Sequence, residues 1–416
     1  MPDTTGAAAA YDQHMKAYRL NVRLITATAL LLLAACARTE TYGFVAVLGN
    51  DTTSVERVTR TGHRIVGDAI GRSPAVTRRH WEAKLGPNGV IQSWSMDTYI
   101  PNAPPDDQRI HHTAAFSDRA TSFTRRTSAG DHSWAYQKTY PETVPWNAFV
   151  YATWELLLDA ARRQPDMTHA RIGQYFFEGW DEGHVGYSDI ERNPDGSYAI
   201  SSTGLAGTGT ARVDTNGRLV SYSGQGTTYK QEVRRITNVP DLDAIAARFA
   251  ADEQRTGLAR SLSPRATVSA TVGKASLTID YGRPARRGRT LVGDLLPYDE
   301  VWRTGANAAT QLTVSAPVVL AGVALRPGTY TLWTLPTRKG VSLIINGQSG
   351  QWGTEYDAGQ DVARRPMTVD SVPGNVELFT IRVDGPPSGG HDGVSRLTME
   401  WGTFRWSAPI RAGAGR

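Results

Sequence analysis

Short stretches in which apolar and polar residues alternate fill most of the chain after residue 41. Tyr42–Leu48, Ser54–Arg60 and His63–Ala69 are examples, and turn-forming residues such as Gly, Asn and Asp separate them. Alternation with a period of two places successive side chains on opposite faces of a strand, and tight turns join such strands into hairpins. The pattern continues to about residue 140 and returns over 174–235. It predicts a long antiparallel β-meander.

One segment breaks this pattern. Asn147 is a typical N-cap residue, and Ala148–Arg163 carries apolar side chains over most of a helical circumference. A helix that is apolar nearly all round is buried, so we expect it to lie across the concave face of a curled sheet, as in a half-barrel. It either fills that space or parts from the sheet to hold a hydrophobic ligand. A second helix, Asp241–Glu253, is expected to close this domain, whose predicted bounds are 41–256.

The remainder of the chain predicts a second β domain over 262–412. Glu253–Arg265 reads as a linker that ends in a Ser-Pro pair. After it come short β-branched or alternating runs, including Lys274–Tyr281, Gln311–Ser315 and Val341–Ile345, with Gly, Pro and Asn between them. The number of short strands and the absence of a long helical period favour a β-sandwich or a jelly roll. The fold class predicted for the whole chain is therefore mainly β.

The N-terminus carries a pattern of a different kind. Lys16, Arg19 and Arg23 precede an uncharged apolar run, Leu24–Ala35, which ends at Cys36. The run suits the core of a signal peptide and is shorter than the roughly 20 residues that span a bilayer. The sequence Leu-Ala-Ala-Cys resembles the lipobox of bacterial lipoproteins, whose cysteine is acylated and becomes the mature N-terminus. An ordinary core cysteine in a short buried helix is the alternative.

This resemblance implies a cellular location for the protein. Residues 1–35 would be an extension and a signal peptide, and Met15 is an alternative start to Met1 because residues 1–14 fit no signal peptide. Acyl chains such as palmitate on Cys36 would hold the mature chain stably on a membrane. Ala37, rather than Asp, after the cysteine implies transfer to the outer membrane. We therefore expect a lipid-anchored protein on the periplasmic side of the outer membrane.

Composition narrows the functional classes. The 416 residues carry a formal net charge of +5, with basic and acidic residues interspersed rather than clustered, so we do not expect nucleic-acid binding. Cys36 is the only cysteine, which excludes a disulfide within the chain. The sequence contains no nucleophile elbow, Walker loop or zinc-ligand spacing, and we expect neither a metal nor a cofactor.

The C-terminal half contains the most specific motifs. They are Tyr281-Gly282-Arg283-Pro284, Gly288-Arg289, Val301-Trp302-Arg303-Thr304-Gly305-Ala306-Asn307 and Gly328-Thr329-Tyr330-Thr331-Leu332. Their order resembles the bacterial family known as domain of unknown function 2911, over roughly Pro264–Val383. Val341 departs from it, since a Trp is expected there. Members of the family are exported proteins, and the family implies no established activity.

The candidate ligand-binding residues lie in and around these motifs. Arginine forks can grip carboxylate, phosphate or sulfate groups, and aromatic rings can stack on a sugar or another ring. The residues are Arg283, Tyr298, Trp302, Arg303, Asn307, Trp352 and Tyr356. Alternatively, Arg303 and Asn307 fasten an irregular loop by bonding its backbone, and Trp302 fills the core.

Three functions remain open from the sequence. The first is a non-enzymatic lipoprotein that binds a lipid or glycan of the envelope. The second is a periplasmic hydrolase or lyase that uses the loop carrying Arg283, Arg303 and Asn307. The third is a structural scaffold of the envelope. The helix at 148–163 separates the first from the third, because a packed helix favours a scaffold and a cavity beneath it favours binding.

Overall fold

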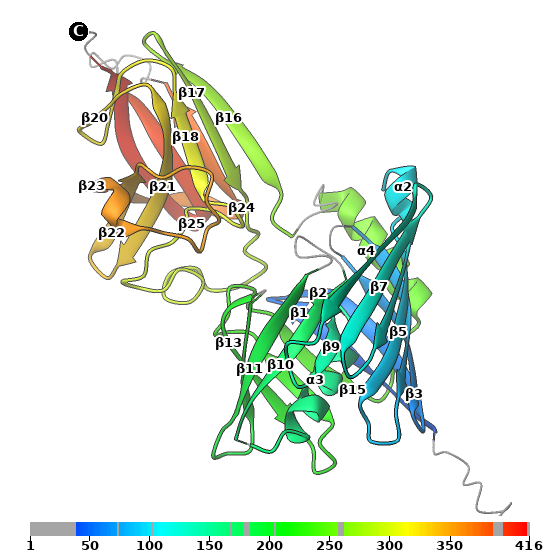
Figure 1. Cartoon of the computed structure of the whole chain (residues 1–416). Helices are drawn as coiled ribbons and strands as arrows, with labels where there is room; N and C mark the ends of the chain where they lie inside the picture. The colour runs from blue at the N-terminus through cyan, green and yellow to red at the C-terminus, as the bar shows by residue number, and fades with distance from the viewer. Residues whose placement is uncertain are drawn as a thin grey trace, which may run out of the picture.

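The computed structural model describes residues 39–72, 75–101, 103–147, 149–166, 168–177, 184–203, 205–256, 262–385 and 394–413. Over these residues the chain is mainly β with few helices, which confirms the predicted fold class (Figure 1). Cys36 and the rest of the predicted export segment lie outside the described residues.

One sheet of 15 strands forms the N-terminal half. Its strands lie in the order β8-β7-β6-β5-β4-β3-β2-β1-β15-β14-β13-β12-β11-β10-β9, and only the β9–β10 pair is parallel. The strands are β1 (Thr39–Leu48), β2 (Asp51–Thr61), β3 (Arg64–Gly71), β4 (Thr77–Leu85), β5 (Ile91–Tyr99), β6 (Arg109–Phe116), β7 (Ala120–Thr127), β8 (Gly130–Gln137), β9 (Thr143–Trp146), β10 (His169–Phe176), β11 (Val185–Arg192), β12 (Tyr198–Ser202), β13 (Leu205–Val213), β14 (Leu219–Ser223) and β15 (Glu232–Ile236).

The two edges of this sheet lie near each other because a short segment joins them. β8 ends at Gln137 and β9 begins at Thr143, and a chain of that length spans at most about 20 Å. The sheet therefore curls back on itself, as Figure 1 shows. At its centre β1 pairs with β15, so the first and last strands of the meander close the middle of the sheet.

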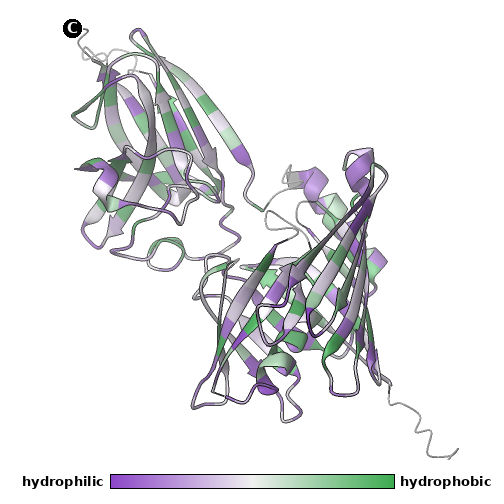
Figure 2. Cartoon of the chain, viewed as in Figure 1, coloured by the Kyte–Doolittle hydropathy of each residue, from purple (hydrophilic) through white to green (hydrophobic). Residues whose placement is uncertain are grey.

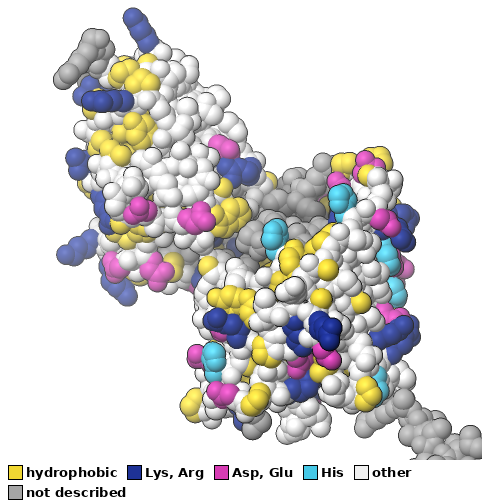
Figure 3. Space-filling view, in the orientation of Figure 1, with side chains coloured by type: hydrophobic (Ala, Val, Ile, Leu, Met, Phe, Trp, Pro, Cys, Tyr) yellow, Lys and Arg dark blue, Asp and Glu magenta, His cyan; other side chains and the backbone are white. Residues whose placement is uncertain are grey.

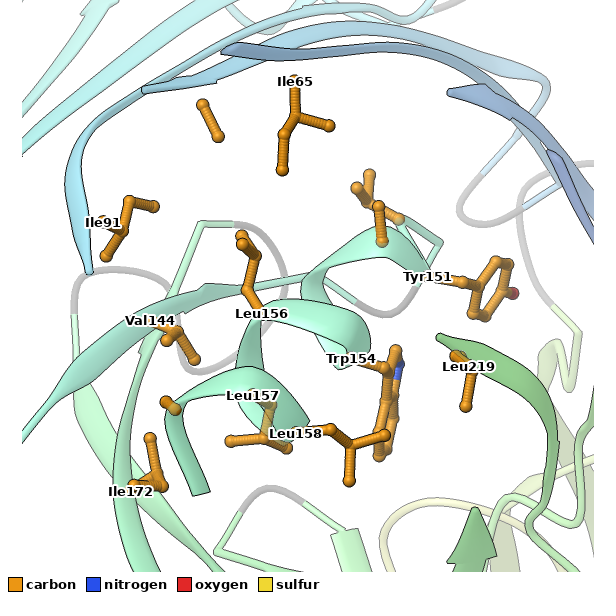
Figure 4. Packing of buried hydrophobic residues seen from close by; sticks show 14 of the residues in the cluster. Ile65, Ile91, Val144, Tyr151, Trp154, Leu156, Leu157, Leu158, Ile172 and Leu219 are labelled. Carbon is orange, nitrogen blue, oxygen red and sulfur yellow. The ribbon is translucent and has the colours of Figure 1, made fainter. Parts of the chain in front are cut away.

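Helix α3 (Ala152–Arg162) occupies the hollow of the curled sheet. Leu157, Leu158 and Ala160 are fully buried, and their apolar neighbours come from strands on both sides. Figure 4 shows the helix side chains pointing outward in several directions, towards Ile65 and Ile91 on one side and Leu219 on another. The predicted helix is present, and it fills the space under the sheet with side chains.

The start of α3 differs from the prediction. Asn147 does not cap the helix, because its Oδ1 accepts from the Phe149 N–H in the preceding turn and the helix begins only at Ala152. Glu56 on β2 takes the capping role. Its Oε2 accepts hydrogen bonds from the backbone N–H groups of Tyr151 and Ala152 at 2.7 and 3.1 Å, and its Oε1 accepts from Trp81. A carboxylate at a helix N-terminus satisfies otherwise unpaired N–H groups.

A second buried carboxylate fixes the helix from its own side. Glu155 on α3 accepts hydrogen bonds from the Tyr42 hydroxyl at 2.5 Å, from the Leu219 N–H at 3.0 Å and from the Arg235 guanidinium at 2.7 Å. Burial raises the pKa of Glu155, and the charge of Arg235 opposes that shift. These contacts tie α3 to β1, β14 and β15, so the helix is held by polar contacts as well as by packing.

Helix α4 (Leu242–Thr256) packs on the opposite, outer face of the sheet. Its apolar residues Leu242, Ile245 and Phe249 cover Val55 and Ile70, which point outward from β2 and β3. The short helix α2 (Pro105–Gln108) joins β5 to β6. Figure 2 shows green and purple residues alternating along many of the strands, the pattern from which the sheet was predicted.

The C-terminal half is a sandwich of two sheets around one core. Residues from both sheets, such as Leu277, Leu312, Phe379 and Trp406, belong to the same buried cluster. The six-stranded sheet has the order β16-β17-β18-β21-β22-β23 and the four-stranded sheet β20-β19-β25-β24. The elements are β16 (Arg265–Val272), β17 (Ala275–Gly282), β18 (Thr310–Val314), β19 (Val318–Leu320), β20 (Val323–Leu325), β21 (Gly328–Thr337), β22 (Gly340–Asn346), the 3₁₀ turn η1 (Ala358–Gln360), β23 (Asp361–Pro366), β24 (Thr368–Asp384) and β25 (Ser395–Ala412).

The two halves touch at Arg287, in the loop that follows β17. Its side chain is only 4% exposed, and its guanidinium donates to the carboxylate of Asp51 at the start of β2. Its carbonyl accepts from the Asn50 N–H at 2.9 Å, and its own N–H donates to Glu377 at 2.7 Å. Arg287 therefore joins the β1–β2 turn of the first half to β24 of the second.

Candidate functional site

A groove of about 760 Å³ lies on the outer face of the 15-stranded sheet. Its floor is formed by β3 to β7, and the first turn of α4, with Asp241 and Asp243, forms one wall. This face is opposite the core that holds α3, because residues next in sequence to the groove residues, such as Val58, Trp81 and Met96, point inward and are buried.

The groove is crossed by a row of charged side chains and histidines in perfect register. The backbone pairing places each of its members directly opposite the next, on neighbouring strands. We call these residues the outer ladder: Arg57, Asp68, His80, Asp97, His111, Arg126 and Asp131. In Figure 3, basic, acidic and histidine side chains gather along the edge of the molecule where Figure 1 places β3 and β5.

Neighbours in the outer ladder bond to one another in pairs. His80 Nδ1 lies 2.8 Å from Asp68 Oδ1, and His111 Nδ1 lies 2.7 Å from Asp97 Oδ1. Arg126 forms a two-pronged contact with Asp131, at 2.9 and 2.8 Å. A carboxylate next to Nδ1 favours the tautomer in which Nδ1 carries the proton, which leaves Nε2 as an acceptor. Both histidines are thus oriented in the same way, each by an aspartate on the preceding strand.

A second row lies beside the outer ladder, nearer to α4. Ile70, Arg78, Tyr99 and Arg109 are directly opposite one another on β3 to β6. Arg78 donates to Asp243 of α4 at 2.6 Å, and the guanidinium of Arg109 lies 4.5 Å from the centre of the Tyr99 ring. This row supplies the groove with an aromatic ring and with guanidinium donors.

The charges on this outer face balance. Among the residues that line the groove, Arg57, Arg78, Arg109 and Arg126 point to this side, and so do Asp68, Asp97, Asp241 and Asp243. The ladder pairs are well exposed, with side-chain exposures of 54% for His80 and 64% for Asp97. Exposed pairs of this kind add little to stability, roughly 0–1 kcal/mol each.

Sequence reasoning missed the groove. Each ladder residue occupies an outward position of its own strand, and alternation alone shows that much for Asp68 or His80. Their alignment into one row depends on the register of successive hairpins, which turn geometry sets. A signal that could have pointed to the groove is the repeated placement of Asp or His at outward positions of consecutive strands.

The residues predicted as a binding loop are found in several places. Arg283 donates from Nε to the Phe379 carbonyl at 3.1 Å and from Nη2 to Thr380 at 2.9 Å. Trp302 stacks on Trp401 with centroids 5.7 Å apart and meets the Phe379 ring edge-on at 5.0 Å. Arg283 therefore contacts β24, and Trp302 contacts both β24 and β25, so both side chains brace the sandwich.

Arg303, Asn307 and Trp352 come together at one end of the six-stranded sheet. Burial lowers the pKa of Arg303, whose side chain lies against Gly353. Asn307 has a positive φ of 64°, and its carbonyl accepts from the Gly353 N–H at 2.9 Å. Trp352 is 40% exposed beside them. Arg283 and Arg303, the two arginines predicted to bind an anionic group together, thus bond to or pack against different parts of the sandwich.

Tyr298 and Tyr356 each have a partner of their own. Arg338 lies over the Tyr298 ring at 4.8 Å. The Tyr356 hydroxyl donates to Asp361 at 2.7 Å, and burial together with that carboxylate raises the pKa of Tyr356 to about 12. None of the seven predicted residues lines the groove.

The interior of the curled sheet offers little space. The cavity found there, beside Trp154 and Tyr222, measures about 30 Å³, enough for a water molecule or two. Among the described residues, no group of three or more His, Cys, Asp or Glu side chains is placed to hold a metal ion. No helix in those residues is both long enough and apolar enough to cross a membrane.

Comparison with known proteins agrees with the motifs of the C-terminal half. Residues 263–410 match the family described as a protein of unknown function, DUF2911, which confirms the expected resemblance for this part of the chain. No curated protein matches the sequence.

Two solved structures show distant likeness. One is a beta-barrel-like protein of domain of unknown function DUF1849 from Brucella abortus, 11% identical, with 49% of this chain and 97% of that chain covered and a TM-score of 0.31. The other comes from work on the cell entry of botulinum neurotoxin type C, 8% identical, with coverages of 91% and 89% and a TM-score of 0.12. At these scores neither bears on fold or function.

Proposed function

We propose that the protein is an exported lipoprotein, anchored to the outer membrane through Cys36, that binds a glycan of the cell envelope in the groove on its outer face. The groove is the observation that carries the binding proposal. It combines an aromatic ring, guanidinium donors and paired carboxylate and imidazole acceptors in one cavity of about 760 Å³. Cavities of this size with a few polar groups are typical of small-ligand sites.

The anchor is supported by the sequence pattern around Cys36. The basic segment, the apolar run and the single cysteine stand in the order that lipoprotein export requires. β1 begins at Thr39, three positions after the cysteine. The folded chain would therefore sit close to the membrane surface, among envelope polymers.

The packed interior favours a polar ligand over a hydrophobic one. The space under the sheet that could have held a lipid is filled by α3, whose residues Leu157 and Leu158 are fully buried. By the criterion set out from the sequence, the packed helix favours a scaffold, which is the second candidate function. The groove distinguishes the two, since a scaffold has no need of an aromatic and polar cavity.

A hydrolase or lyase centred on Arg283, Arg303 and Asn307 receives less support. The guanidinium of Arg283 donates hydrogen bonds to the Phe379 carbonyl and to the Thr380 hydroxyl. Asn307 fixes the backbone of Gly353, and Arg303 packs beside it. The Asn307 contact is made by its backbone carbonyl, and Arg303 Nε is buried without a hydrogen-bond partner among the described residues, so loop fastening by these two side chains stays a prediction.

Two experiments test the proposal. Growth with an alkyne analogue of palmitate is expected to label the wild-type protein and to leave Cys36→Ser unlabelled; label on both proteins would contradict the anchor. For the ligand, hydrogen exchange is measured on the full chain with and without a solubilised envelope glycan extract. Slower exchange in β4 to β6, with β10 and β11 unchanged, is the expected result. Equal exchange in all strands would contradict binding in the groove.

A further inference from the structure

The outer ladder repeats at a fixed interval. Its members lie on consecutive strands, and neighbouring strands in a sheet are about 4.8 Å apart. That interval is close to the length of one sugar ring in an extended chain. Asp68, His80, Asp97 and His111 therefore form a row of evenly spaced groups that crosses the strands at right angles.

The ladder presents hydrogen-bond acceptors at each of these steps. In the neutral tautomer in which Nδ1 donates to Asp68 or Asp97, Nε2 of His80 and of His111 is left as an acceptor. Each aspartate keeps a second carboxylate oxygen. Arg109 in the adjoining row adds N–H donors next to the ring of Tyr99. Hydroxyl groups donate and accept at once, so a surface that alternates acceptors and donors suits a ligand rich in hydroxyls.

The balance of charge selects against charged ligands. Five arginines, of which Arg79 is buried, and four aspartates line the groove, so a strongly anionic or cationic ligand would meet groups of its own sign beside groups of the opposite sign. At one side the Arg78–Asp243 ion pair joins the sheet to α4, at 2.6 Å.

We infer that the groove holds an extended, neutral oligosaccharide that lies across β3 to β6, with about one sugar ring on each strand and the Tyr99–Arg109 pair as its platform. The inference rests on the proposed function and makes it more specific. It names the class of glycan, its direction and its length.

The test uses the full chain with Cys36→Ser, titrated in a calorimeter with two neutral series, cello-oligosaccharides and oligomers of N-acetylglucosamine, from one to six units. In at least one series the affinity is expected to rise about 10-fold or more between the disaccharide and the tetrasaccharide, and then to level off. Oligogalacturonides of the same lengths carry a carboxylate on each ring and are expected to bind at least about 10-fold more weakly.

Matched variants locate the binding. Tyr99→Ala and Asp97→Asn are each expected to lower the affinity for the tetrasaccharide by about 10-fold. The first variant loses a stacking face, and the second loses a charged hydrogen-bond acceptor. Tyr187→Ala is the control. Arg171 lies over the Tyr187 ring at 4.1 Å on β10 and β11, the same arrangement outside the groove. Tyr187→Ala is expected to bind the tetrasaccharide with the same affinity as the wild type. Thermal melts of the three variants check that they fold.

The outcomes separate this inference from the broader proposal. Equal affinity for mono- and tetrasaccharide, tighter binding of the anionic series, or no binding of either neutral series would overturn the extended neutral chain. If an envelope extract still slows exchange in β4 to β6, the groove remains a glycan site of another kind. If that protection is also absent, both proposals fail.

Discussion

The Oε2 atom of Glu56 accepts a hydrogen bond from the backbone N–H of Tyr151 at 2.7 Å, across 95 positions of sequence. The same carboxylate receives the N–H of Ala152 and the indole N–H of Trp81. It is completely buried. This contact fixes where α3 begins and how it lies under the sheet, so it is the point at which the filled interior can be tested most sharply.

Glu56→Gln is expected to destabilise the protein. Even when the carboxyl is protonated, both of its oxygens can accept a hydrogen bond, whereas the amide of Gln has one acceptor oxygen and brings an NH₂ group against N–H donors. The substitution therefore leaves at least one buried donor unpaired, at a cost of about 1–3 kcal/mol. Urea unfolding measures the change. Glu82→Gln is the control, since Glu82 pairs with the exposed Arg64 and its loss should cost less than about 1 kcal/mol. Equal effects of the two substitutions would contradict the capping role of Glu56.

Stability should also depend on pH through this group. Burial raises the pKa of Glu56 to about 8, against the opposing effect of the N–H groups of Ala152, Tyr151 and Trp81. The folded state then holds the proton more tightly than the unfolded state. The resulting stabilisation is complete below about pH 4.5 and is lost as the pH rises through 8, by at most about 1.4 kcal/mol per pH unit.

The free energy of unfolding, measured from pH 4 to pH 9, tests this dependence. The difference between wild type and Glu56→Gln isolates the contribution of Glu56, because other groups titrate in both proteins. The wild type should lose more stability than the variant between pH 5 and pH 8. Parallel curves would show that Glu56 stays in one protonation state over that range.

Leu157→Ala tests the packing of α3 directly. The Leu157 side chain is fully buried inside the curled sheet, and its removal should leave a cavity that costs about 2–5 kcal/mol. Val220→Ala on β14 is the surface control, 43% exposed, with an expected change within about 0.5 kcal/mol. A loss below about 1 kcal/mol at Leu157 would mean that the interior is loosely packed and open to a ligand.

Arg287→Ala should uncouple the two halves. The substitution removes the hydrogen bonds to Asp51 and to the Leu262 carbonyl, together worth about 1–3 kcal/mol. Scanning calorimetry is expected to show two thermal transitions further apart than in the wild type. Arg338→Ala, which removes a contact with Tyr298 inside the sandwich, serves as the control. Unchanged spacing after Arg287→Ala would mean that the halves unfold independently.

Local features of the fold could be predicted because local sequence determines them. Alternation in segments such as Tyr42–Leu48 marked the strands, and the unbroken apolar surface of 148–163 marked a buried helix. The cap of that helix could not be predicted, since Glu56 lies almost 100 residues away. The pairing of β1 with β15 is equally non-local.

The candidate site could not be predicted from the sequence either, because non-local strand pairing brings its residues together. The predicted loop residues, such as Arg283 and Trp302, attracted attention as dense motifs, and in the structure they largely brace the sandwich. The groove residues come from six strands, β2 to β7, and from the start of α4. Asp97 meets His80 and His111 only because two successive hairpins share the same register. A register shift of one residue would place these side chains on the inner face of the sheet.

The protein is proposed to be lipid-anchored and to bind an envelope glycan in its outer groove. Native mass spectrometry of the full chain, released gently from its own envelope, tests this proposal most directly. The wild type should carry acyl mass on Cys36 and a second, non-covalent mass built of sugar repeats. The double variant Tyr99→Ala/Arg109→Ala should keep the acyl mass and lose the sugar. A wild type without a sugar adduct, or the same adduct on both proteins, would contradict the account.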